Sequence, residues 1–276
     1  MPFLLALCVA QDEGAFWEAL LEKIRPLWIG KNDPAPYVPA RPAELEALSA
    51  FAAGPPDAPL PPALEAAGWR VDWIPFGTEK LRLLREAPEA RRGRGILLTR
   101  PAGGPLALMA PHRFFDKHTG EVARGAFFRA KAGALLENTA HRHWRRAEDV
   151  EHGPADAAHQ EATALHALAK GVVSRPGVLL AQLHGFNETD APLAIVSDGT
   201  RDPAPWARKA AEALRASKIP TELYGVDGRR LGGTENVLRK HARRFLHVEM
   251  SLPLRESLKA DASRLADVLR DAAEGD

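Results

Sequence analysis

The sequence contains a single cysteine, Cys8, among its 276 residues. One thiol cannot close an internal disulfide, and it excludes zinc sites built from several cysteines. A transition-metal ion in this protein would therefore be bound by histidine and carboxylate side chains. The sequence has ten histidines and 36 acidic residues, so a site of that kind is open to it.

The chain also lacks an excess of charge, since 37 basic residues balance 36 acidic ones to a formal net charge of +1. Without a global field that attracts polyanions, we expect no nucleic-acid partner. No run approaches the roughly 18 consecutive apolar residues that cross a bilayer, so no membrane span is expected. The GxSxG, P-loop and GxGxxG motifs are missing as well, which disfavours serine hydrolases, nucleoside triphosphatases and dinucleotide-dependent dehydrogenases.

The first ten residues, MPFLLALCVA, are apolar and end in a triplet that resembles a small-residue cleavage site. They are compatible with the end of a truncated signal peptide, which would make the protein periplasmic or secreted. They are equally compatible with a first buried strand in a cytoplasmic protein, because no basic region precedes them.

Alternating apolar patterns predict the fold class. We expect strands at residues 69–73, 95–100, 106–110, 178–183, 193–196, 221–224 and 244–248, and helices at residues 119–131, 161–171, 204–216 and 254–272. Alternation of this kind is typical of an α/β fold with a mixed, mainly parallel sheet flanked by helices. Residues 1–94 include a Pro-rich and Ala-rich stretch, and we expect them to form an N-terminal extension that packs on an α/β domain at residues 95–276.

Three of the apolar runs end on residues that bind or assist a metal ion. ALMAPH ends on His112, LLAQLH on His184 and FLHVE on Glu249. Active sites of open α/β sheets lie at the carboxyl ends of the strands, so these side chains are expected to meet there. Two imidazoles and one carboxylate leave an open position on a zinc ion, which is the catalytic pattern. We therefore predict one Zn²⁺ ion, with Glu249 as the general base.

Two acids follow His112 and compete for the role of the third ligand. Asp116 stands four residues after His112, so a turn could bring its carboxylate back to the same ion. Glu121 stands in the first turn of the expected helix, where the amide dipoles favour a carboxylate even without a metal. The sequence leaves both open.

Each of the other candidates also has an ordinary structural explanation. His184 could be a core histidine bonded to a carbonyl, and Gly185 after it would permit a tight turn at the end of the strand. Glu249 could form an ion pair with Arg255 or Arg142, although a carboxylate inside an apolar run is costly to bury without a partner or a function. His247 shares a strand face with Glu249 and could orient its carboxylate.

A polar cluster supplies candidates for substrate binding. Asn138 and Arg142 stand at the two ends of this cluster and are both candidates, since an arginine suits the bidentate capture of a substrate carboxylate. A surface salt bridge would explain Arg142 equally well. His159 and Arg255 are further candidates, and the loop Leu231–Asn236 offers glycines, a hydroxyl and an amide that could line a pocket.

In the order and context of these residues, the chain from about residue 95 to 270 resembles a group of zinc-dependent exopeptidases and amidohydrolases with a phosphorylase/hydrolase-like fold. The group includes zinc carboxypeptidases, N-acetylmuramoyl-alanine amidases, N-formylglutamate amidohydrolases and poly-γ-glutamate hydrolases. The closing segment FLHVEMSLPLR resembles the amidohydrolase and poly-γ-glutamate hydrolase end of the group. The His-x-x-Glu pattern of carboxypeptidases is absent, because Arg113, Phe114 and Phe115 follow His112.

The resemblance implies a metal-dependent enzyme that cleaves an amide or peptide bond. Its partner would be a small molecule or peptide that bears a carboxylate, such as an N-acyl amino acid, a γ-glutamyl peptide or a cell-wall peptide. Glu249 would be the general base and acid, and Arg142 and Arg255 would hold the substrate carboxylate. The resemblance leaves the oligomeric state of the protein open.

Two other classes of protein use similar patterns. A non-catalytic binding protein could keep the same fold and pocket without a metal. An iron or manganese oxygenase could use the His-x-Glu spacing found at His159–Glu161 and at His247–Glu249. Such oxygenases usually have an all-β jelly-roll fold, so the alternation of strands and helices favours the hydrolase.

Overall fold

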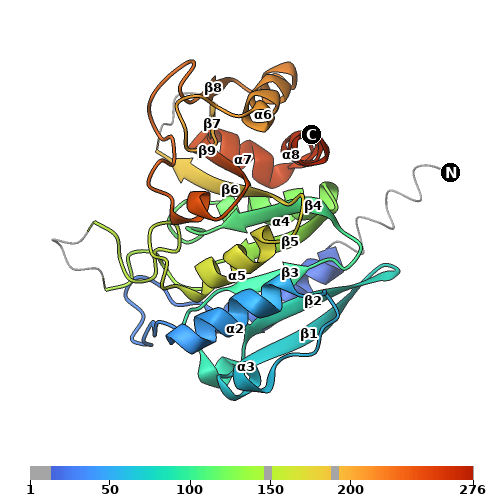
Figure 1. The fold of residues 1–276 in the computed structure, drawn as a ribbon, viewed down its shortest axis with the longest axis vertical. Coiled ribbons are helices and arrows are strands. Elements are labelled where there is room, and N and C mark those ends of the chain that lie inside the picture. The colour runs from blue at the N-terminus through green and yellow to red at the C-terminus, as the bar shows by residue number, and fades with distance from the viewer. Residues whose placement is uncertain (1–13, 146–150, 188–192, 276) are drawn as a thin grey trace.

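The computed structural model describes residues 14–145, 151–187 and 193–275 and is built around one mixed sheet of nine strands (Figure 1). The strand order across the sheet is β1-β2-β3-β5-β4-β6-β9-β7-β8. The strands are β1 (Trp69–Phe76), β2 (Glu79–Glu86), β3 (Ile96–Thr99), β4 (Gly104–Ala110), β5 (Ala132–Glu137), β6 (Leu179–Phe186), β7 (Ala194–Ser197), β8 (Thr221–Leu223) and β9 (Arg244–Ser251). The predicted α/β fold class is confirmed.

Four neighbouring strands at the centre of the sheet, β5, β4, β6 and β9, run parallel to one another. The pairs β1–β2, β2–β3, β3–β5 and β7–β9 are antiparallel, whereas the edge strands β7 and β8 pair in parallel with each other. Because the central strands share one direction, their carboxyl ends lie at the same edge of the sheet.

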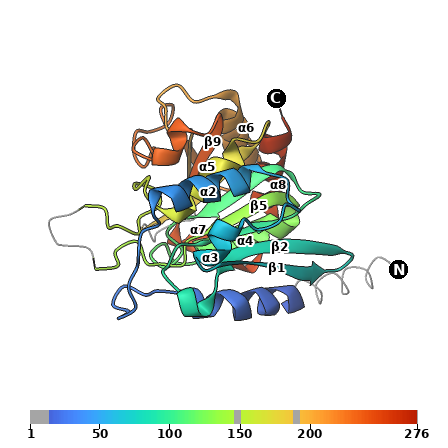
Figure 2. The ribbon, with the colours of Figure 1, turned by 60° about the horizontal axis from the view of Figure 1, so that its bottom comes forward.

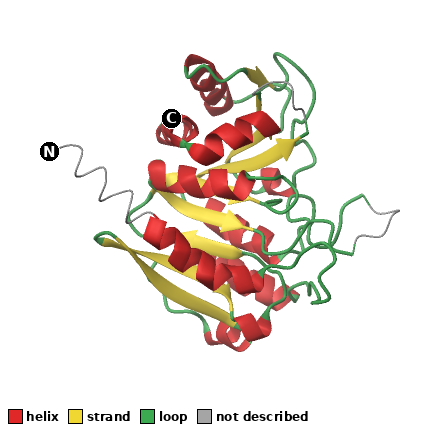
Figure 3. Cartoon of the chain, turned by 180° about the vertical axis from the view of Figure 1, so that it is seen from behind, coloured by secondary structure: helices red, strands yellow, loops and turns green. Residues whose placement is uncertain are grey.

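Helices cover both faces of the sheet. The helices on one face are α2 (Pro42–Ala53) and α5 (Ala164–Val173), which pack against each other in front of the sheet in Figure 1. Those on the other face are α4 (Thr119–Arg129), α6 (Pro205–Ala216), α7 (Leu252–Ala260) and α8 (Ser263–Glu274), seen from behind in Figure 3. Helical residues 14–24 also lie on this second face, opposite α2 in Figure 2. The short helix α3 (Pro62–Ala66) packs on β1.

The central strands are buried on both faces, which explains their continuous apolar sequences. In β4, Leu106 and Leu108 belong to the core under α4 and α8, whereas Ala107 and Met109 belong to the core under α5. Successive side chains of a strand point to opposite faces, so one apolar run supplies both cores.

The prediction of one continuous C-terminal helix at residues 254–272 is wrong in one respect, because the structure has two helices there, α7 and α8. The break falls at Asp261, whose Oδ1 accepts hydrogen bonds from the backbone N of Ser263 at 2.9 Å and from its hydroxyl at 2.6 Å. An aspartate that bonds nearby backbone in this way favours a cap over a helix interior.

Residues 1–94 contribute more to the sheet than the sequence indicated. The strand at 69–73 is found as β1, but β2 was not predicted, because charged residues interrupt its apolar pattern. Both strands precede residue 94 and extend the same sheet, and the division of the chain at that residue stays a prediction. The apolar residues 1–10 lie outside the described ranges. Among the described residues, no helix combines the length and apolar character that crossing a bilayer requires.

Candidate metal centre

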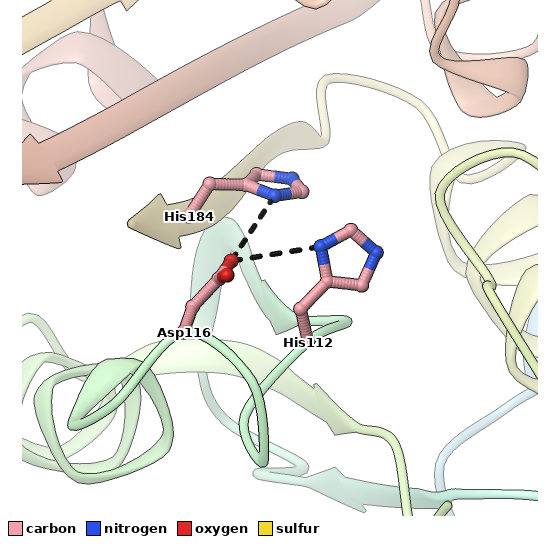
Figure 4. Close-up of side chains that lie close together, drawn as sticks. All are labelled: His112, Asp116 and His184. Atoms are coloured by element: carbon pink, nitrogen blue, oxygen red, sulfur yellow. Dashed lines mark ion pairs between the residues drawn. The ribbon is translucent and has the colours of Figure 1, made fainter. Parts of the chain in front are cut away.

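His112, Asp116 and His184 meet at the carboxyl edge of the central strands (Figure 4). His112 follows β4 by two residues, and the backbone N of Asp116 bonds to the carbonyl of His112 at 2.8 Å. This turn brings the Asp116 carboxylate back to the histidine. His184 projects from the neighbouring strand β6 toward the same carboxylate. The structure therefore unites three of the predicted metal ligands.

The spacing of these three side chains fits one zinc ion. Asp116 Oδ2 lies 3.5 Å from His112 Nδ1 and 3.6 Å from His184 Nδ1. Both distances exceed the usual hydrogen-bond length of about 2.9–3.0 Å. They match the separation of about 3.4 Å that two ligand atoms have around a tetrahedral zinc ion with bonds of 2.0–2.2 Å. All three side chains are buried.

The electrostatics of the cluster favour the metal-binding forms of two ligands. Burial raises the pKa of Asp116, but contacts with His112 and His184 outweigh it and hold this pKa well below the usual range. Burial and the neighbouring His247 lower the pKa of His184 to about 4. At neutral pH, Asp116 is therefore ionised and His184 is neutral, as metal ligation requires.

Burial lowers the pKa of His112, but the carboxylates of Asp116 and Asp156 outweigh it and raise this pKa above its ordinary value. A proton on His112 would thus compete with a metal ion, so binding should release that proton.

Asp156 is a candidate site residue that the sequence analysis missed. Its fully buried carboxylate accepts a hydrogen bond from His112 Nε2 at 2.7 Å, and it also contacts Arg142 Nη2 at 2.7 Å and His159 Nδ1 at 3.1 Å. A carboxylate behind a metal-binding histidine fixes the ring orientation and leaves the other nitrogen free for the metal. Asp156 stands three residues before His159, but no apolar run leads to it, so the strand pattern could not reveal it.

His112, Asp156 and His159 also lie close enough together to form a metal-binding group. His112 Nε2 and Asp156 Oδ1 are 2.7 Å apart, which is a hydrogen-bond distance and shorter than the separation of about 3.4 Å between two ligand atoms on one zinc ion. In the neutral His112 ring Nε2 donates to Asp156, so the lone pair is on Nδ1, where it accepts from Arg142 Nη1 at 3.0 Å; a metal ion on Nδ1 would take the place of this hydrogen bond. We therefore assign the metal to the Nδ1 side of His112 and an orienting role to Asp156.

Asp156→Asn is expected to weaken zinc binding by about 10–100-fold, the usual effect of removing a carboxylate behind a histidine ligand. The measurement is a competition titration of zinc between the protein and a coloured chelator. Asp202→Asn is a suitable control, because the side chain of Asp202 is 98% exposed. An unchanged zinc affinity in Asp156→Asn would argue against the assigned role.

Glu249 lies beside the candidate metal ligands. It is the direct neighbour of His184 in the pairing of β6 with β9, and both residues line a cavity of about 340 Å³ together with His112. Glu249 Oε1 accepts from His247 Nε2 at 3.1 Å, whereas the buried Oε2 has no hydrogen-bond partner among the described residues. Burial raises the pKa of Glu249, but His247 outweighs burial and lowers it. Glu249 is therefore an ionised carboxylate with one oxygen available to a ligand in the cavity.

The candidate substrate-binding residues separate into two sets. Arg142 and His159 line the cavity, together with the loop Leu231–Asn236. Asn138 and Arg255 are not among its lining residues. The expectation that these two side chains bind substrate is therefore not supported by their positions.

Asn138 and Arg255 bond to the backbone around the site. Asn138 Nδ2 donates to the carbonyl of Ala155, next to Asp156, at 2.8 Å. Arg255 is 1% exposed and donates to the carbonyls of Met250 at 3.1 Å, Phe186 at 2.9 Å and Lys117 at 2.5 Å. Arg255 thus joins the ends of β6 and β9 to the turn that carries Asp116.

The structure does not bring Glu121 to the other candidate ligands. Its carboxylate lies on α4, 3.8 Å from His118 Nδ1 and 3.9 Å from Arg124 Nη2, and it lines a different pocket, beside Lys259. Of the two acids that the sequence left open, only Asp116 lies with the histidines.

The glycines of the site are explained by close contacts. The tight turn expected at Gly185 is wrong, because this residue continues β6 and its N donates to Asp116 Oδ2 at 3.1 Å. A Cβ at Gly185 would overlap the guanidinium of Arg255. Gly233 has a φ of +61° and packs on the His247 ring, where a Cβ would lie 2.7 Å from the ring. Gly233 therefore shapes the cavity wall, and Gly185 leaves room for Arg255.

Comparison with solved structures returns proteins of the kind that the sequence resembles. They include a zinc-free structure of YNDL, with 17% identity, a TM-score of 0.41 and coverage of 65% of this chain and 89% of that one. A bacteriophage poly-γ-glutamate hydrolase has 14% identity, a TM-score of 0.43 and coverage of 76% and 92%. An N-formylglutamate amidohydrolase from Ralstonia eutropha JMP134 has 15% identity, a TM-score of 0.39 and coverage of 65% and 99%. No family model and no curated protein matches the sequence, so we infer function from the site's own residues.

Proposed function

We propose that this protein is a zinc-dependent hydrolase that cleaves an amide or peptide bond in a small substrate bearing a carboxylate. The observation that carries the proposal is the cluster of His112, Asp116 and His184 in one cavity with the ionised Glu249. Three protein ligands leave a coordination position for water or substrate, which is the catalytic form of a zinc site. A structural zinc site would instead be closed by a fourth protein ligand.

A zinc ion held by His112, Asp116 and His184 would supply an activated water and polarise the scissile carbonyl. Glu249 accepts the proton of the attacking water on its unpartnered Oε2 and returns it to the leaving amine. His247 holds the other oxygen of that carboxylate and so fixes the direction of Oε2. Gly233 packs against the His247 ring and so helps to keep this pair in place.

Arg142 and His159 provide the positive and polar side of the cavity. The buried Asp156 fixes both side chains, so they are held in place before a substrate arrives. Arg142 lies next to His112 and can stabilise negative charge that develops on the carbonyl oxygen or attract the substrate carboxylate. Substrates of this kind include N-acyl amino acids, γ-glutamyl peptides and cell-wall peptides.

Zinc removal and restoration test the proposal. Zinc-loaded protein is expected to release amine from at least one member of a panel of N-acyl amino acids, γ-glutamyl peptides and muropeptides. Chelation should abolish this release, because the attacking water loses its activation, and added zinc should restore it. The released amine is measured by a chromogenic amine assay. Turnover that survives complete removal of metal would contradict the proposal.

A further inference from the structure

A second pair of histidines lies away from the proposed catalytic cavity. His166 stands in the first turn of α5, and His241 follows the 3₁₀ helix η3 (Val237–Lys240). Both line a cavity of about 460 Å³ between α2 and α5, whose walls include Glu161, Ser49 and Lys170. No residue of the proposed catalytic site lines this cavity.

The two rings have nearly the same mutual geometry as the two histidines of the first site. The centroids of His166 and His241 are 5.3 Å apart with an interplanar angle of 74°, and those of His112 and His184 are 4.9 Å apart with the same angle. Two imidazoles on one tetrahedral ion with Zn–N bonds of 2.0–2.1 Å have ring centroids about 5 Å apart. The second pair is therefore spaced as two ligands of one ion are.

Each ring of the second pair also has a nitrogen without a partner. His166 is 3% exposed. Within the part of the chain that the structure describes, its buried Nδ1 and the buried Nε2 of His241 have no hydrogen-bond partner. Buried polar atoms are normally paired, and leaving them unpaired is unfavourable. A metal ion would satisfy one nitrogen of each ring.

Glu161 offers a third donor. It lines the same cavity, and its Oε1 is held only by an exposed contact with Lys240 Nζ at 3.4 Å. The three donors are not grouped within ligand distance in this structure, but an exposed ion pair of this length contributes little, so the carboxylate can turn toward the rings at small cost. Two imidazoles and a carboxylate suit zinc and neighbouring transition metals.

We propose that His166, His241 and Glu161 form a second transition-metal site, which takes Zn²⁺ in the cavity between α2 and α5. An ion there would join the start of α5 to the end of η3. Segments next to these elements carry His159 and Asn236 of the catalytic cavity, and Val237 N bonds to Ala158 O at 3.0 Å between them. The second ion would therefore support the catalytic cavity from behind and have a structural role.

Zinc stoichiometry tests this site independently of activity. Protein is dialysed against zinc chloride, freed of excess zinc and measured by elemental mass spectrometry. We expect two ions per chain in the wild type, one in His184→Ala and one in the double variant His166→Gln/His241→Gln. Lys170→Ala is the matched control, because Lys170 lines the same cavity but is not a proposed ligand, and it should keep two ions.

The outcomes for the two sites can be separated. If the first site binds no metal, the wild type should hold one ion that the double variant loses. If the double variant does not fold, His184→Ala still decides, since it should retain one ion and melt at a higher temperature with zinc than after chelation. The second site is contradicted if the double variant binds as much zinc as the wild type or if His184→Ala binds none.

Discussion

Glu249→Gln is expected to retain the zinc ion and to lose about 10²–10⁴-fold in kcat, the usual contribution of a general base. The amide keeps the size of the carboxylate but cannot take up a proton from water. Since Glu249 bonds to His247 and is not one of the grouped metal ligands, the zinc content should not change. The measurement pairs kcat with zinc content on the same preparation.

Glu235→Gln is the matched control for this experiment. Glu235 also lines the cavity, but it is exposed and lies on the loop Leu231–Asn236. We expect its kcat to stay within a few-fold of the wild type. Full activity in Glu249→Gln would remove this residue from the mechanism, and loss of zinc there would make it a ligand instead.

Asp116→Asn is expected to weaken zinc binding by more than the roughly 10–100-fold that the loss of an outer carboxylate causes. The substitution removes the charge of the carboxylate that faces both His112 Nδ1 and His184 Nδ1. Activity should fall in parallel, because the activated water depends on the ion. Zinc affinity is measured by competition with a coloured chelator.

Glu121→Gln is the control, because the sequence offered this residue as the alternative ligand and the structure places it elsewhere. Its zinc affinity should equal that of the wild type. The opposite result, with zinc lost in Glu121→Gln and kept in Asp116→Asn, would show that the wrong carboxylate has been assigned.

The parts of the site that end apolar strands could be predicted from the sequence. His112, His184 and Glu249 each terminate or interrupt a buried run, and strands of one direction bring such positions to one edge. Asp116 could not be separated from Glu121, because the choice depends on how the turn after β4 closes. That turn is set by backbone bonds to the carbonyl of His112, which leave no periodic pattern in the sequence.

The residues that were missed or misassigned depend on tertiary contacts. Asp156 belongs to an irregular segment, and only the folded chain brings it within 2.7 Å of His112. Arg255 was expected to bind a carboxylate, but its guanidinium donates hydrogen bonds to three backbone carbonyls. Two of these carbonyls are distant in the sequence, and the third lies five residues before Arg255. The helix break at Asp261 was hidden because apolar spacing continues through it, while the side chain of Asp261 bonds locally to Ser263, where α8 begins.

A binding protein with the same fold remains the competing account, and it differs from the proposed hydrolase in one property of the purified protein. Both accounts use the cavity and its polar lining. Only the hydrolase requires a metal ion at His112, Asp116 and His184.

The most direct test of the central claim is therefore the zinc content of tag-free protein, measured by elemental mass spectrometry after zinc is offered and excess removed. His112→Ala and His184→Ala are purified in the same way. We predict that the wild type holds a zinc ion that both variants lose. Wild-type protein that binds no zinc, or that keeps the same zinc content in both variants, would contradict the metal centre.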